Sequence, residues 1–152
     1  FKQAASSFTM WLSASSGVMK LISETREAVS NIKELDNILT EIRKTSDMTD
    51  ESLEKLGLSS YDAASEYGRT SSDYLSAFES MARSGFYNET GEGMAKLSLL
   101  AQSAGDMSQE IADNYLLATN AAYKYGGDVE KLNAVLDGMN TINKMVALYG
   151  NI

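Results

Sequence analysis

Residues 11–42 read WLSASSGVMKLISETREAVSNIKELDNILTEI, and this stretch decides the fold. Apolar or small residues recur at alternating intervals of three and four: Trp11, Ala14, Val18, Leu21, Thr25, Ala28, Ile32, Leu35, Leu39 and Ile42. This period is typical of the a/d positions of a coiled coil. We therefore predict a long coiled-coil-like helix over residues 1–46. Its candidate oligomer seam consists of Trp11, Val18, Leu21, Ile32, Leu35, Leu39 and Ile42.

The apolar face of this helix is wider than the seam alone. Ile22, Val29 and Ile38 occupy flanking positions that a two-stranded coiled coil usually gives to charged residues. A wide face favours three or more helices in one bundle, or a helix covered by the rest of the chain. A long amphipathic helix in a monomeric bundle is the alternative, and the sequence leaves both open.

The period stops at residues 45–50 (TSDMTD), whose side-chain oxygens are typical of helix starts. Beyond this point, Gly residues and Ser, Thr or Asp residues alternate as stop and start signals. They predict five shorter helices: 51–67, one opening at residues 70–72 and ending near Gly85, one from Thr90 to Gly105, one opening at residues 106–109 and ending at Gly126 and Gly127, and one from Asp128 to Gly150.

No stretch alternates with period two for long enough to indicate a strand. We predict an all-α fold, with residues 1–46 as a long helix and residues 47–152 as a compact bundle of about five helices. The last helix carries an apolar stripe of its own: Val129, Leu132, Leu136, Met139, Ile142 and Val146.

Composition excludes several classes of function. The chain has no Pro, Cys or His, so it lacks thiolate nucleophiles, disulfides and the commonest general base and metal ligand. Its net charge of −8 divides into +1 for residues 1–46 (six basic, five acidic) and −9 for residues 47–152 (seven basic, sixteen acidic). Because an acidic surface repels phosphate backbones, we expect no nucleic-acid binding.

Three short motifs could indicate a catalytic or phosphate-binding site. Ser52 and Lys55 match S-x-x-K of class A β-lactamases, but no S-D-N or K-T-G accompanies them. Residues 91–96 (GEGMAK) lack the spacing of a phosphate-binding loop. Glu51 and Glu54 fit a solvated helix face better than a pair of catalytic carboxylates. We predict no catalytic residues, no cofactor and no metal site, and therefore no enzyme.

The uncharged run at residues 3–19 is serine-rich and shorter than a usual membrane span. We therefore expect neither a transmembrane helix nor a signal peptide there. The chain begins with Phe1 rather than Met, which leads us to expect a piece of a longer polypeptide.

The order of helices and turns resembles the core domain of bacteriophage tail tape-measure proteins over roughly residues 30–145. The segments that carry the resemblance are 39–46 (LTEIRKTS), 81–86 (MARSGF), 97–108 (LSLLAQSAGDMS), 111–116 (IADNYL) and 137–140 (DGMN). After about Lys144 the match is loose.

This resemblance implies a structural role in a phage or prophage tail. A tape-measure segment would occupy the lumen of the tail tube and help to set its length. It would be made in the bacterial cytoplasm and reside in the virion tail. The implied partners are other copies of the chain (a trimer or larger), tail-tube proteins, tail-tip proteins and, during ejection, a membrane.

Two other interpretations remain open at this stage. A secreted helical effector or membrane-active helical module would use the serine-rich start for insertion. A generic helical adaptor would use the seam for partner binding, and the heptad pattern alone does not separate it from a tape measure.

Overall fold

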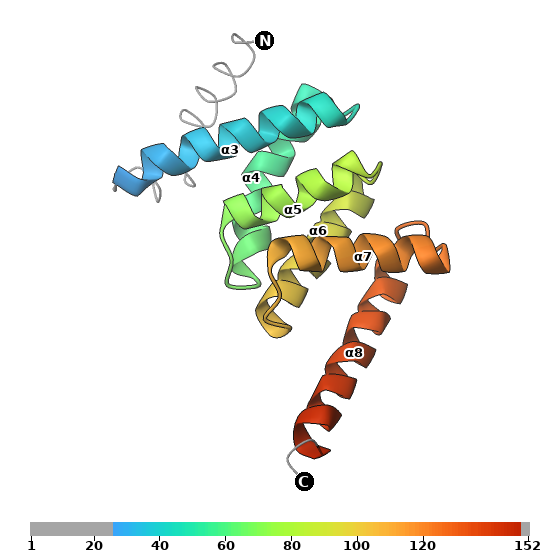
Figure 1. Cartoon of the computed structure of the whole chain (residues 1–152). Coiled ribbons are helices and arrows are strands. Elements are labelled where there is room, and N and C mark those ends of the chain that lie inside the picture. The colour runs from blue at the N-terminus through green and yellow to red at the C-terminus, as the bar shows by residue number, and fades with distance from the viewer. Residues whose placement is uncertain (1–25, 150–152) are drawn as a thin grey trace.

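The computed structural model describes residues 26–149 of the chain, and Figure 1 shows their arrangement. Within this range every element is an α-helix and no strand occurs, so the all-α prediction is confirmed. The helices are α3 (Arg26–Thr45), α4 (Asp50–Ser65), α5 (Ser71–Arg83), α6 (Asn88–Ala104), α7 (Gln109–Tyr123) and α8 (Val129–Tyr149).

Side-chain oxygens start most of these helices, as the sequence indicates. Thr49 Oγ1 accepts a hydrogen bond from the Ser52 amide at 3.2 Å, and Ser108 Oγ accepts one from the Ile111 amide at 3.4 Å. Asp128 Oδ1 accepts from the Lys131 amide at 3.2 Å at the start of α8. Each bond satisfies a backbone donor that has no partner inside its own helix.

The predicted start of α6 at Thr90 is wrong. The helix begins at Asn88, and its N-cap residue Tyr87 makes no side-chain capping bond. Packing determines this helix start instead: the Phe86 amide donates to the Met81 carbonyl at 2.9 Å, and Gly91 lies directly against Phe86 and Phe78. A Cβ on Gly91 would lie 2.5 Å from the Phe86 carbonyl oxygen, so only glycine permits this approach.

The end of α7 also differs from the prediction of a stop at Gly126 and Gly127. Lys124 ends the helix in the left-handed conformation, at φ 53°. The Asn120 side chain then accepts a hydrogen bond from the Gly127 amide at 2.7 Å, which closes the turn into α8. A side chain one turn before the helix end thus shapes the connection, and the two glycines follow it.

Two apolar cores share the central pair α5 and α6. The first core gathers buried residues of α3, α4 and one face of α5, with Ala95 and Leu99 from α6. The second joins Met81 of α5 to buried residues of α6, α7 and α8. Tyr74 and Phe78 are the largest side chains buried completely, and both belong to α5. The central pair therefore separates α3 and α4, which pack in the first core, from α7 and α8, which pack in the second (Figure 1).

Helix α3 is part of this packing. It lies mainly against α5, and Ser72 Oγ of α5 donates a hydrogen bond to Glu34 Oε1 at 2.7 Å. The predicted division at residue 46 does not separate the described part of α3 from the bundle, because residues 35–42 share the first core. For residues 1–25, which lie outside the described range, the division stays a prediction.

Helix α8 extends away from the bundle (Figure 1). Leu132 and Leu136 are buried in the second core, and Met139 packs against it. Beyond Met139 the helix has left its neighbours, so Ile142 and Val146 are exposed rather than continuing the buried stripe of Leu132 and Leu136.

Candidate functional site

A buried carboxylate between α6 and α7 is the centre of the main polar cluster. Asp113 of α7 is 3 % exposed. Its Oδ1 accepts a hydrogen bond from Ser98 Oγ of α6 at 2.5 Å, and its Oδ2 accepts one from Gln109 Nε2 at 3.3 Å. Gln102 Nε2 in turn donates to Ser98 Oγ at 3.1 Å. The network joins α6 to α7 inside an otherwise apolar contact.

Burial raises the pKa of Asp113 above its ordinary value, because desolvation disfavours the charged form. Hydrogen bonds from Ser98, Ser80 and Gln109 act in the opposite direction and favour the carboxylate. Desolvation is the larger effect. A raised pKa can mark a functional acid, but a satisfied structural network produces the same shift.

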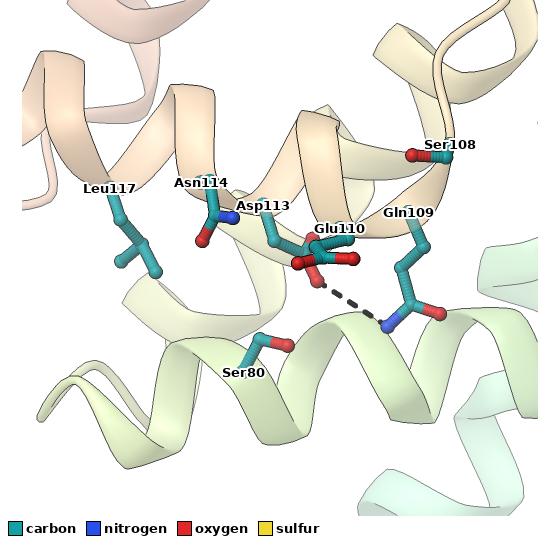
Figure 2. A pocket seen from close by; sticks show the side chains of 7 residues that line it. All are labelled: Ser80, Ser108, Gln109, Glu110, Asp113, Asn114 and Leu117. Carbon is teal, nitrogen blue, oxygen red and sulfur yellow. Dashed lines mark hydrogen bonds between the residues drawn. The ribbon is translucent and has the colours of Figure 1, made fainter.

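A hollow of about 490 Å³ opens beside Asp113, between α7 and α5 (Figure 2). Figure 2 shows Gln109, Asp113 and Leu117 of α7 directed toward the helix that carries Ser80. The remaining lining residues are Ser108, Glu110 and Asn114. Ser108 Oγ already caps α7, and Ser80 Oγ donates to the Ser76 carbonyl at 3.3 Å. Ser80 also hydrogen-bonds to the Asp113 carboxylate. Among the described lining residues there is no His or Lys that could act as the base for either serine.

A second, smaller hollow lies at the edge of the first core. It is lined by Ser59, Asp62, Ala63, Glu66, Tyr74, Glu92 and Lys96. The hydroxyl of Tyr74 is buried and has no hydrogen-bond partner among the described protein atoms. Burial also raises the pKa of both Tyr74 and Glu92, while Lys96 counteracts the shift at Glu92. Three carboxylates here share the opening with one lysine.

The S-x-x-K motif and residues 91–96 do not form the catalytic or phosphate-binding arrangements that such motifs would require. Lys55 Nζ lies 2.9 Å from Glu51 Oε1, whereas Ser52 Oγ lies 3.0 Å from Thr49 Oγ1. Ser52 and Lys55 are therefore each engaged with another residue, as the structural interpretation of S-x-x-K expects. Gly91 and Lys96 both lie within α6, so residues 91–96 form helix and not a phosphate-binding loop.

The seam residues divide into two groups. Trp11, Val18 and Leu21 lie outside the described residues, and Ile32 is described only as backbone of α3. Leu35, Leu39 and Ile42 are buried in the first core of this same chain. In this structure α4 and α5 cover these three side chains, as the alternative of a helix covered by the rest of the chain predicts, and their assignment to a seam between copies stays a prediction. The physical reason is the width of the apolar face, which fits a helix packed on its own bundle.

Two features were missed from the sequence. The Asp113–Ser98 contact joins residues fifteen positions apart on different helices, and the only signal in the sequence was a carboxylate in segment 111–117, which also contains the polar residue Asn114. The second feature is the exposure of the last turns of α8, missed because the sequence shows an apolar stripe without indicating where its cover ends. Its signal was the absence of any Asp or Glu after Asp137.

Within the described residues, His, Cys, Asp and Glu side chains nowhere gather in threes around a point that could hold a metal ion. No helix in residues 26–149 is both long and apolar enough to cross a membrane. The fold and its polar sites define a helical packing domain, in which the buried polar groups join helices to one another. Comparison with protein-family models, curated proteins and solved structures found no match to this chain.

Proposed function

We propose that this chain is a structural segment of a phage tail tape-measure protein. The observation that carries the proposal is where the family-like segments fall in the fold. Residues 39–46 form the end of α3 and its turn, 81–86 the end of α5 and its turn, and 97–108 the end of α6 with the turn into α7. Residues 111–116 lie in α7 and residues 137–140 in α8. Three of the five segments therefore coincide with helix ends and their turns, and the other two lie within helices.

The chemistry of the described surface supports a mechanical role. In the Asp113 hollow, Asp113 takes part in helix-joining hydrogen bonds and Ser108 caps α7, while Ser52 and Lys55 of the S-x-x-K motif each contact another residue. The net charge of −8 disfavours contact with DNA and favours solubility at high local concentration. On this proposal the chain acts in the virion tail, with tail-tube and tail-tip proteins and other copies of itself as partners.

Packed helices and projecting helices would contribute differently to the length of the tail. Helices α4 to α7 fold back on one another, so added residues there do not extend the molecule. Helix α8 has 21 residues, which at about 1.5 Å each gives a length of roughly 30 Å, and its part beyond Met139 projects from the bundle. A tape measure converts residue number into distance only in such projecting helices.

The test is the tail length of the phage or prophage that encodes this chain. We expect that inserting four heptads into α8 after Lys144 lengthens the tail by about 40 Å, the rise of 28 helical residues. The same number of Gly and Ser residues inserted in the turn between α6 and α7 should leave it unchanged. Electron microscopy of purified virions measures both. Unchanged tails in the α8 variant, with the protein present in the virion, would refute the tape-measure role.

A further inference from the structure

The C-terminal half of α8 displays an apolar face that nothing in the described chain covers. Its first turns bury Leu132 and Leu136 in the second core. Four large apolar side chains follow in the last turns and are mostly exposed: Ile142 at 61 %, Met145 at 55 %, Val146 at 63 % and Leu148 at 72 %. Ile142, Met145 and Val146 share one side of the helix, whereas Leu148, two residues after Val146, lies on the other side. An exposed apolar patch such as the one formed by the first three residues marks an interaction surface.

The spacing on this half is that of a coiled coil. Val135, Met139, Ile142, Val146 and Tyr149 follow one another at intervals of four, three, four and three residues. Such a stripe forms the seam at which knobs of one helix enter holes of another. The partner that fits it is a helix with the same period, and a second copy of α8 has that period by identity.

Charge also favours a second copy. The chain carries 21 acidic residues, so most of its surface repels an identical molecule. After Asp137 there is no carboxylate, and Lys144 is the one charged side chain. Lys144 lies two residues from Ile142 and Val146, which at about 100° per residue puts it on the opposite side of the helix. Two copies can therefore meet along this face without carboxylates opposing one another.

We propose that the exposed face of α8, formed by Met139, Ile142, Met145 and Val146, is a self-association surface that pairs with the same face of a second copy. In the proposed tail protein, α8 would form the contact between copies. The role of this contact in a tail rests on the proposed function. We assign the contact to α8 rather than to Leu35, Leu39 and Ile42, because the chain's own core covers these three side chains. Two exposed turns bury less than the ~800 Å² per partner of a standard interface, so the association is weak and depends on concentration.

Sedimentation equilibrium of the whole chain tests the proposal. We expect the average mass to rise from 16.5 kDa toward at least twice that value between ~10 μM and ~1 mM, the range in which weak contacts form. The variant Ile142→Asp with Val146→Asp should stay at the monomer mass throughout. Both residues are exposed, so circular dichroism should show unchanged helix content. A wild-type chain that remains monomeric up to ~1 mM overturns the proposal.

A charge-matched control separates the seam from a general effect of charge. Asn140→Asp with Lys144→Ala also changes the net charge by −2, at exposed positions away from the Ile142–Val146 stripe. It should associate as the wild type does. Loss of association in this control would show that the Ile142–Val146 stripe is not the contact. The same conclusion would follow if Trp11→Asp with Val18→Asp lost association while the α8 variant kept it.

Disulfide trapping gives an independent measurement, because the chain contains no cysteine. Ile142→Cys and Val146→Cys should form covalent dimers on mild oxidation several-fold faster than Asn140→Cys. Equal rates at all three positions would contradict the pairing. The outcome does not depend on tail length, so failure here and failure of the tape-measure role are distinguishable.

Discussion

At the scale of single residues, Asp113 shows how a polar side chain can join two helices. The carboxylate is buried between α6 and α7, yet both of its oxygens accept hydrogen bonds. Removing it would leave the buried Ser98 hydroxyl and the part-buried Gln109 amide without their acceptor. We expect Asp113→Ala to lower the free energy of unfolding by about 1–3 kcal/mol, measured by urea denaturation.

The pH dependence at this residue has a definite sign. Burial raises the folded-state pKa of Asp113, so its contribution to stability is complete below the unfolded-state pKa and is lost as pH rises through the folded-state pKa. Asp113→Asn keeps an acceptor for Ser98 and cannot ionise. The stability of Asp113→Asn relative to the wild type should therefore increase from pH 3 to pH 7, as measured by paired urea titrations. A relative stability that falls with rising pH would contradict the burial argument.

Tyr74 differs from Asp113 because its buried polar group has no hydrogen-bond partner among the described protein atoms. Its ring fills the first core, but its hydroxyl has no protein partner and faces the hollow that contains Glu92 and Lys96. Apolar packing therefore holds this residue, and the hydroxyl contributes no described hydrogen bond. The burial that raises its pKa also keeps it neutral throughout the ordinary range of pH.

At the scale of elements, the capping box of α5 is the clearest local signal that the structure reproduces. Thr70 Oγ1 accepts from the Asp73 amide at 3.2 Å, and Asp73 Oδ2 accepts from the Thr70 amide at 3.1 Å. Both bonds form within four residues, so they require no tertiary contact. This locality explains why the start of α5 could be predicted.

We expect Thr70→Ala to cost about 1 kcal/mol in the free energy of unfolding, because the Asp73 amide loses its acceptor. Thr70→Ser should retain most of the stability, since its hydroxyl can accept the same bond. Thr141→Ala, on the exposed part of α8, is the matched control and should change little. Chemical denaturation of the three variants measures the difference, and an equal loss in all three would rule out capping as its cause.

The start of α6 shows that local sequence signals do not always predict a helix boundary. Near its start at Asn88, Gly91 packs against the Phe86 carbonyl and against the ring of Phe78, which belongs to α5. The oxygen of Thr90 was a plausible cap by type, but packing decided the boundary two residues earlier. Tertiary contact outweighs side-chain propensity where a glycine allows two backbones to approach closely.

At the scale of the whole molecule, α3 separates two interpretations of the same heptad pattern. Leu39 is buried against the chain's own α4 and α5. We expect Leu39→Asp to lower the free energy of unfolding by about 3–5 kcal/mol, because an ionised group would enter an apolar core. Thermal melting followed by circular dichroism measures this loss.

Asn37→Asp, an exposed change on the same helix, serves as the control and should melt within a few degrees of the wild type. If Leu39→Asp instead kept full stability and lost only self-association, Leu39 would face another copy and the intramolecular packing of α3 would be wrong. The α8 variants leave both cores intact, so the two experiments probe different contacts.

The sequence by itself determined the helical class, the turns near residues 47, 69, 85, 106 and 126, and most helix starts. These features depend on periodicity and on capping bonds formed within a few residues. Only the tertiary structure decided which apolar faces are covered. Leu39 of α3 meets α5, more than thirty residues further along the chain, whereas Ile142 of α8 lies beyond the reach of any described helix. A stripe of apolar residues specifies that a helix has a face to bury, but the identity of the surface that buries it depends on where the chain brings its other helices.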